Sequence, residues 1–190
     1  MLRVPRWVTL PPTMAEVGPE RTRISHRAGH LVFGLDDRIA STVYGTITAM
    51  ATVAAYGRAF PNSPWTVEEL VVSTAVVLWI AHLYTHALSE SLAEDRRLSV
   101  ARVSTIGVRE LGILLAAVPP CIALALGALG VVDETASIWL ALALGLATLA
   151  VEGMRYARIE SLGAAGTLVA VGANVGIGLL VVLLKAEVLH

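Results

Sequence analysis

The chain has 190 residues, of which 56% are hydrophobic and only 15% are charged. Soluble domains carry about 25% charged residues, so this composition excludes an ordinary soluble domain, in keeping with a mean hydropathy of +0.72. The formal net charge of -1 argues against a nucleic-acid-binding protein, which needs a basic face to neutralise phosphates. The single cysteine, Cys121, excludes a disulfide within the chain.

Five long runs without a charged residue predict five membrane-spanning helices. A helix that crosses the hydrocarbon core needs about 17–25 mostly apolar residues, and each run has a length in this range. The runs are residues 39–57, 70–89, 111–132, 135–151 and 161–184. The sequence therefore predicts an all-α fold, a five-helix transmembrane bundle formed by residues 36–190.

Two segments outside these runs have patterns of their own. Residues 1–35 are rich in Arg and Pro and lack the apolar stretch of about 7–15 residues that marks a secretory signal, so we expect a flexible N-terminal tail. Residues 92–108 begin with acidic and basic residues and continue with spaced apolar ones. This pattern predicts a short helix on the cytoplasmic surface of the membrane.

The positions of the basic residues predict the orientation of the spans. Cytoplasmic loops carry an excess of Lys and Arg. Of the 14 Lys and Arg residues, only Arg58 and Lys185 fall on the side opposite to the N-terminus when the segments alternate across five spans. We therefore expect a cytoplasmic N-terminus and an external C-terminus, in a multi-pass protein of the cell (inner) membrane.

Small residues indicate where spans could approach one another closely. Gly172 and Gly176 have GxxxG spacing in the fifth run, and Gly45 lies in the first. In a membrane such residues allow close contact between helix backbones. Ordinary packing within the bundle is the favoured interpretation, and a seam between two copies of the chain is the alternative.

The main polar feature is a row of ionisable residues at the end of the second run. His82, His86 and Glu90 are spaced by four residues and form one stripe on a helix, with His82 roughly 10 Å inside the cytoplasmic end. The topology brings further carboxylates to the same level, and they are accessory candidates: Glu110, Glu152, Asp36 and Asp37.

This cluster has two interpretations. Imidazole and carboxylate groups could form a divalent metal site at His82, His86 and Glu90, or a proton relay, because histidine at i and i+4 can bind a metal and histidine changes charge near neutral pH. In the other interpretation His82 hydrogen-bonds across the bundle, and His86 and the carboxylates pair with the arginines at the interface: Arg38, Arg109 and Arg155. For the carboxylates the pairing is favoured, since charges are tolerated at helix ends.

The arrangement of the spans resembles the vacuolar iron transporter family, five-span exchangers of iron or manganese for protons. Residues 44–49 (YGTITA) and Thr52 resemble the family pattern Tyr-Gly-x-x-Asp-Gly-x-x-Thr, and residues 89–90 resemble its Gly-Glu-Tyr segment. Pro119 and Pro120 fit the proline-bearing third span. The resemblance implies the five-span scaffold with the orientation given above.

The family's metal site is not carried over with its scaffold. Thr48 stands where the pattern has its metal-binding Asp, Ala49 replaces the next glycine, and the acidic insert between the second and third spans is short. Only Glu90 matches a family acid, so a metal ion would need His82 and His86 as new ligands.

Two functions follow from the sequence as hypotheses. The first is a transporter-like protein that exchanges a divalent metal cation for protons, and the alternative is a non-transporting membrane subunit or assembly factor of a larger complex. No catalytic motif is visible, so we expect no enzyme. The expected partners are the lipid bilayer and either a second copy of the chain or a membrane complex, with no nucleic acid.

Overall fold

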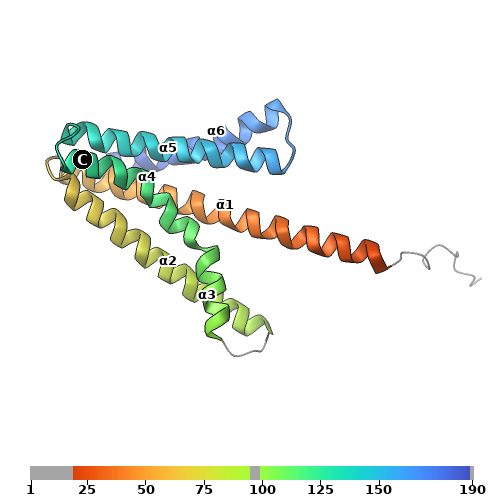
Figure 1. Ribbon diagram of the computed structural model, residues 1–190. Helices are drawn as coiled ribbons and strands as arrows, with labels where there is room; N and C mark the ends of the chain where they lie inside the picture. The colour runs from red at the N-terminus through yellow and green to blue at the C-terminus, as the bar shows by residue number, and fades with distance from the viewer. Residues whose placement is uncertain (1–18, 95–98, 189–190) are drawn as a thin grey trace, which may run out of the picture. The chain divides into compact units, whose positions relative to one another are not determined.

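The computed structural model describes residues 19–94 and 99–188, and the chain is all-α over these residues (Figure 1). The chain divides into two compact units, Met1–Gly34 and Leu35–His190. In the first unit, the described residues form the beginning of a long helix. The second unit contains the predicted spans and every interaction discussed below.

Six helices are present in the described residues. In chain order they are α1 (Pro19–Ala59), α2 (Pro64–Glu94), α3 (Val100–Arg109), α4 (Leu111–Ala128), α5 (Glu134–Ile159) and α6 (Ala164–Val188). Five stretches of them are long and apolar enough to cross a membrane: Arg38–Ala59, Pro64–Leu92, Val103–Ala128, Glu134–Ile159 and Ala164–Leu184. The fold has the all-α character and the number of potential spans that the sequence predicted.

Several helices extend beyond the predicted runs. Helix α1 begins at Pro19, so residues 19–35 are helical where the sequence analysis expected a flexible tail, and residues 1–18 lie outside the described residues. Helix α5 continues to Ile159, past the predicted end at residue 151. The physical reason is that a charged residue limits how much of a helix can enter hydrocarbon without ending the helix itself.

The helix predicted over residues 92–108 is shorter than expected. Helix α2 continues to Glu94, residues 95–98 lie outside the described residues, and α3 occupies Val100–Arg109. Helix α3 is directly followed by α4, and Glu110 stands between them as the N-cap residue of α4. The third potential span, Val103–Ala128, is therefore a broken helix.

Helices α1, α4 and α5 supply the centre of the second unit. About half of the most apolar stretch of α1 is buried (50%), against 17% in α2 and 6% in α6. The core contains Met50 and Val53 from α1, Leu124 from α4 and Leu149 from α5, all fully buried. Helix α2 packs on α4 from one side and α6 packs on α5 from the other.

Two glycines bring the central helices into close contact. A Cβ atom placed on Gly45 would lie 2.8 Å from the backbone of Ile113, and one placed on Gly145 would lie 2.5 Å from Met50 Cγ. At Gly172 and Gly176 of α6, nothing described lies within 4 Å of such an atom. Close contacts predicted from small residues are therefore made among α1, α4 and α5. Helix α6 also approaches α5 closely, since a Cβ atom on Gly153 would lie 2.9 Å from Val171 Cα, whereas the face of α6 that carries Gly172 and Gly176 is open among the described residues.

Candidate functional site

The contact between α2 and α3 places the break between α3 and α4 beside α2. The indole Nε1 of Trp79 donates a hydrogen bond of 3.1 Å to the carbonyl oxygen of Gly107. A Cβ atom on Gly107 would be only 3.4 Å from the Trp79 ring, and the neighbouring Ile106 is 2% exposed. The amphipathic sequence of α3 thus buries its apolar face, and the break that follows lies beside α2.

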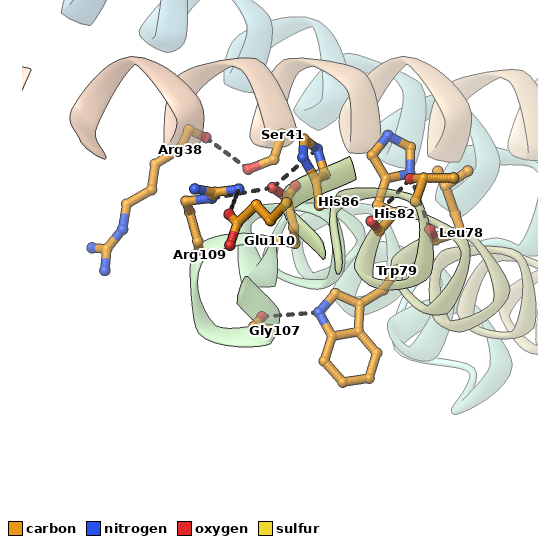
Figure 2. A network of polar contacts seen from close by, with 11 residues as sticks. Arg38, Ser41, Leu78, Trp79, His82, His86, Gly107, Arg109 and Glu110 are labelled. Atoms are coloured by element: carbon orange, nitrogen blue, oxygen red, sulfur yellow. Dashed lines mark hydrogen bonds and ion pairs between the residues drawn. The ribbon is translucent and has the colours of Figure 1, made fainter. Parts of the chain in front are cut away.

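Four ionisable residues lie at or beside the break, and we call them the Glu110 cluster. Arg109 and Glu110 come from the break itself, and His86 and Glu90 come from α2. Figure 2 shows His86, Arg109 and Glu110 of this cluster together with neighbouring residues of α1 and α2. The Glu110 Oε1 atom lies 3.6 Å from His86 Nε2 and 3.7 Å from Arg109 Nε. A second Arg109 nitrogen lies 3.6 Å from Glu90 Oε1. These separations exceed direct hydrogen-bond lengths, so these three pairs are adjacent without a direct hydrogen bond between the atoms named.

Burial differs within this cluster. The Glu110 side chain is 5% exposed, while that of His86 is 45% exposed. A charged group costs much free energy to bury unless other charges or hydrogen bonds compensate it. Glu110 is therefore the member whose charge depends most on its neighbours, and His86 is the member that solvent or headgroups can reach.

His82 is directed to a different set of partners. Its Nδ1 atom lies 3.1 Å from the Leu78 carbonyl oxygen, and since a carbonyl only accepts, Nδ1 is the donor. The His82 ring centre is 4.9 Å from that of Tyr44 on α1 and 6.3 Å from that of His86. This hydrogen bond stays within α2, so the hydrogen bond across the bundle that the second sequence interpretation expected stays a prediction.

The accessory carboxylates do not join this cluster as one group. Glu152 is 4% exposed and accepts two hydrogen bonds from one Arg155 nitrogen, at 2.8 Å and 3.1 Å, one turn along α5. The pairing of Glu152 with Arg155 and of Glu110 with Arg109 agrees with the pairing interpretation. Asp36 and Asp37 lie in α1, but their side chains are outside the described part of the chain.

The predicted metal site has fewer assembled ligands than expected. Among the residues that the structure describes, no three His, Cys, Asp or Glu side chains are grouped so that they could hold a metal ion. The adjacent His86 and Glu110 form a pair, whereas Glu90 contacts Arg109. The structure thus brings together one predicted metal ligand and one accessory residue, and the site at His82, His86 and Glu90 stays a prediction.

Sequence analysis missed Glu68, an acidic residue that lies inside a potential span and lines a groove. Glu68 lies in α2, within Pro64–Leu92, and lines a groove of about 380 Å³ between α2 and α4. The predicted second span began at residue 70 because Glu68 and Glu69 were used as its boundary. The signal that could have found Glu68 is its spacing with Val72 and Val76, which puts all three on one helix face.

Comparisons with protein-family models, with curated proteins and with solved structures give no match for this chain. The resemblance to the vacuolar iron transporter family stays a prediction.

Proposed function

We propose that this chain is a transporter of the cell membrane that exchanges a cation for protons at the Glu110 cluster. The observation that carries the proposal is the position of Glu110. It is 4% exposed and lies at the break of a helix that is otherwise long and apolar enough to span a membrane.

An ionisable group at such a place is expensive to keep. Charged residues within membrane helices are rare and mark ion pathways and proton relays. Broken helices are tolerated at membrane depth where protein surrounds the break or a cavity reaches it, and transporters use them at their binding sites. Glu110 combines both features, with Arg109 beside it in the chain and His86 beside it in space.

The arrangement can support exchange by competition for one carboxylate. A proton and a metal cation both bind carboxylate oxygen and imidazole nitrogen, so the pair formed by Glu110 and His86 can hold either one. When neither a proton nor a metal cation is bound, the guanidinium of Arg109 compensates the charge of Glu110. Two protein ligands completed by water bind a cation weakly enough to release it, which transport requires.

The resemblance to a family of iron and manganese exchangers gives the substrate class to test first, a divalent metal cation. The assay uses the purified full-length chain in liposomes that contain a pH-sensitive dye. Manganese added outside is expected to change the internal pH, and Glu110→Gln is expected to reduce this change to that of protein-free liposomes.

Glu152→Gln is the matched control in the same assay. Glu152 is as buried as Glu110, but it is paired along its own helix by Arg155 and is not a member of the Glu110 cluster. The control should keep most of the flux. An equal loss of flux in Glu110→Gln and Glu152→Gln would mean that flux depends on any buried carboxylate, which would contradict a specific role of the Glu110 cluster.

Helix α6 favours a second candidate function, a non-transporting subunit of a membrane complex. Its apolar stretch is only 6% buried, and space is open around Gly172 and Gly176 among the described residues. Purification from native membranes tests this candidate. A partner present in equal amount, together with no flux of any divalent cation, would support the subunit in place of the transporter.

A further inference from the structure

The groove between α2 and α4 is lined by apolar residues apart from Glu68. Its volume is about 380 Å³. One face of each helix forms it: Glu68, Val72, Ala75 and Val76 from α2, and Leu114, Ala117, Val118, Cys121, Ile122 and Ala125 from α4. Several of these side chains are exposed, namely Val72, Val76, Val118 and Ile122. The groove is therefore open along the side that the protein turns to its surroundings, where lipid would lie if these helices span a membrane.

Glu68 is the only charged residue in this lining. Its Oε2 atom is buried and has no hydrogen-bond partner among the described residues. A carboxylate oxygen that has lost water without gaining a donor is unfavourable. Because Oε2 is covered by protein, a donor from outside can reach the carboxylate only at its other oxygen, where a cation would compensate the charge beside an apolar surface that lacks a cover.

We propose that this groove binds an amphiphile with a primary ammonium head and an apolar body. The ammonium group donates to the Glu68 carboxylate, and the body lies along the α2 and α4 side chains. Charge complementarity selects a cation, since no Lys, Arg or His lines the groove. The need for a donor selects an ammonium with N–H groups over a quaternary one.

The site is independent of the proposed exchange function. Glu68 lies about 27 Å from His86 along α2, at about 1.5 Å per residue, and no residue of the Glu110 cluster lines the groove. Two sources could supply this chemistry, a membrane lipid with an ethanolamine headgroup or a free lipophilic amine.

Alkylation of the single cysteine, Cys121, can report whether the groove is occupied. Cys121 lines the groove and is the single cysteine of the sequence, so alkylation by N-ethylmaleimide reports on this position without any added mutation. The full-length protein is placed in phosphatidylcholine nanodiscs, and the alkylation rate is measured with increasing dodecylamine. Dodecylamine is expected to slow alkylation, whereas dodecanol and dodecyltrimethylammonium should do so far less.

Substitutions identify the contact that holds the amine. Glu68→Gln should weaken protection by dodecylamine about tenfold or more, as expected when a charge-assisted hydrogen bond is lost. Glu69→Gln is the matched control, because Glu69 is exposed and does not line the groove. Val72→Trp keeps Glu68 and fills the groove, so it should also abolish the protection, which keeps the test decisive if Glu68→Gln fails to fold.

Changing the lipid of the nanodiscs distinguishes the two possible sources of the ligand. If the lipid is the occupant, phosphatidylethanolamine nanodiscs alone should slow alkylation in the wild type but not in Glu68→Gln. If only free amines bind, that lipid should have no effect and dodecylamine should protect in both membranes. The proposal is overturned if dodecanol protects as well as dodecylamine, if Glu68→Gln is protected like the wild type, or if neither dodecylamine nor phosphatidylethanolamine slows alkylation.

Discussion

A methyl group added at Gly45 should destabilise the contact between α1 and α4. The Cβ atom of Gly45→Ala would lie 2.8 Å from both the Cα and the carbonyl oxygen of Ile113, and 3.0 Å from Ala116 Cβ. Carbon atoms in favourable contact are about 3.5–4.0 Å apart, so the two helices must separate. Because the contacted atoms belong to the backbone, no side-chain rotation can relieve the overlap.

The expected magnitude follows from two opposing terms. Overpacking a well-packed core costs about 1–3 kcal/mol, and rigid backbone atoms favour the upper end. Alanine regains about 1 kcal/mol over glycine in a helix. The free energy of unfolding of Gly45→Ala should therefore fall by about 2 kcal/mol, which corresponds to a Tm about 4–8 °C lower for a chain of this size.

Thermal unfolding in detergent, followed by circular dichroism, measures this difference. Gly172→Ala is the control, since no described residue lies within 4 Å of a Cβ atom placed there and only the gain in helix propensity should remain. Its Tm should be unchanged or a few degrees higher, by about 2–4 °C at most. An unchanged Tm for Gly45→Ala would refute the close contact with α4, and a large loss for Gly172→Ala would show that α6 packs against a second chain.

Three further substitutions test the local structure, each by the same unfolding measurement. Trp79→Phe removes the hydrogen bond to Gly107 and should cost about 1 kcal/mol, with faster proteolysis between α2 and α3, and unchanged proteolysis would contradict their packing. Asp133→Ala removes the side chain that accepts from the Ala136 N–H at the start of α5 and should cost about 1 kcal/mol, whereas Asp133→Asn should be nearly neutral. Met50→Ala empties a fully buried position and should cost about 2–5 kcal/mol, so a loss below 1 kcal/mol would show that the core there is loosely packed.

Charge-free runs predicted the number of potential spans and most of their central residues, because the free energy of placing a charge in hydrocarbon dominates the sequence pattern. The same signal placed the start of the third predicted run, residue 111, at the break where α3 gives way to α4. It failed at helix ends, since hydrogen bonding within a helix continues past a charged residue. The extension of α1 back to Pro19 is the largest such difference.

The candidate site was predictable at the level of its helices but not of its contacts. Helical spacing correctly placed His82 and His86 one turn apart, and the topology placed Glu110 near them. Which of the two histidines meets Glu110 depends on how α3 packs against Trp79, a tertiary contact with no periodic signal in the sequence. Glu68 was missed because a charged residue was used only as a limit of a span.

Proton release on cation binding tests the central claim most directly. The purified protein in detergent and weak buffer is mixed with manganese, and the pH change is recorded for the wild type, Glu110→Gln and Glu152→Gln. Exchange at the Glu110 cluster predicts that the wild type and Glu152→Gln release protons and that Glu110→Gln releases none. Proton release from Glu110→Gln equal to that of the wild type would contradict the assignment of the site.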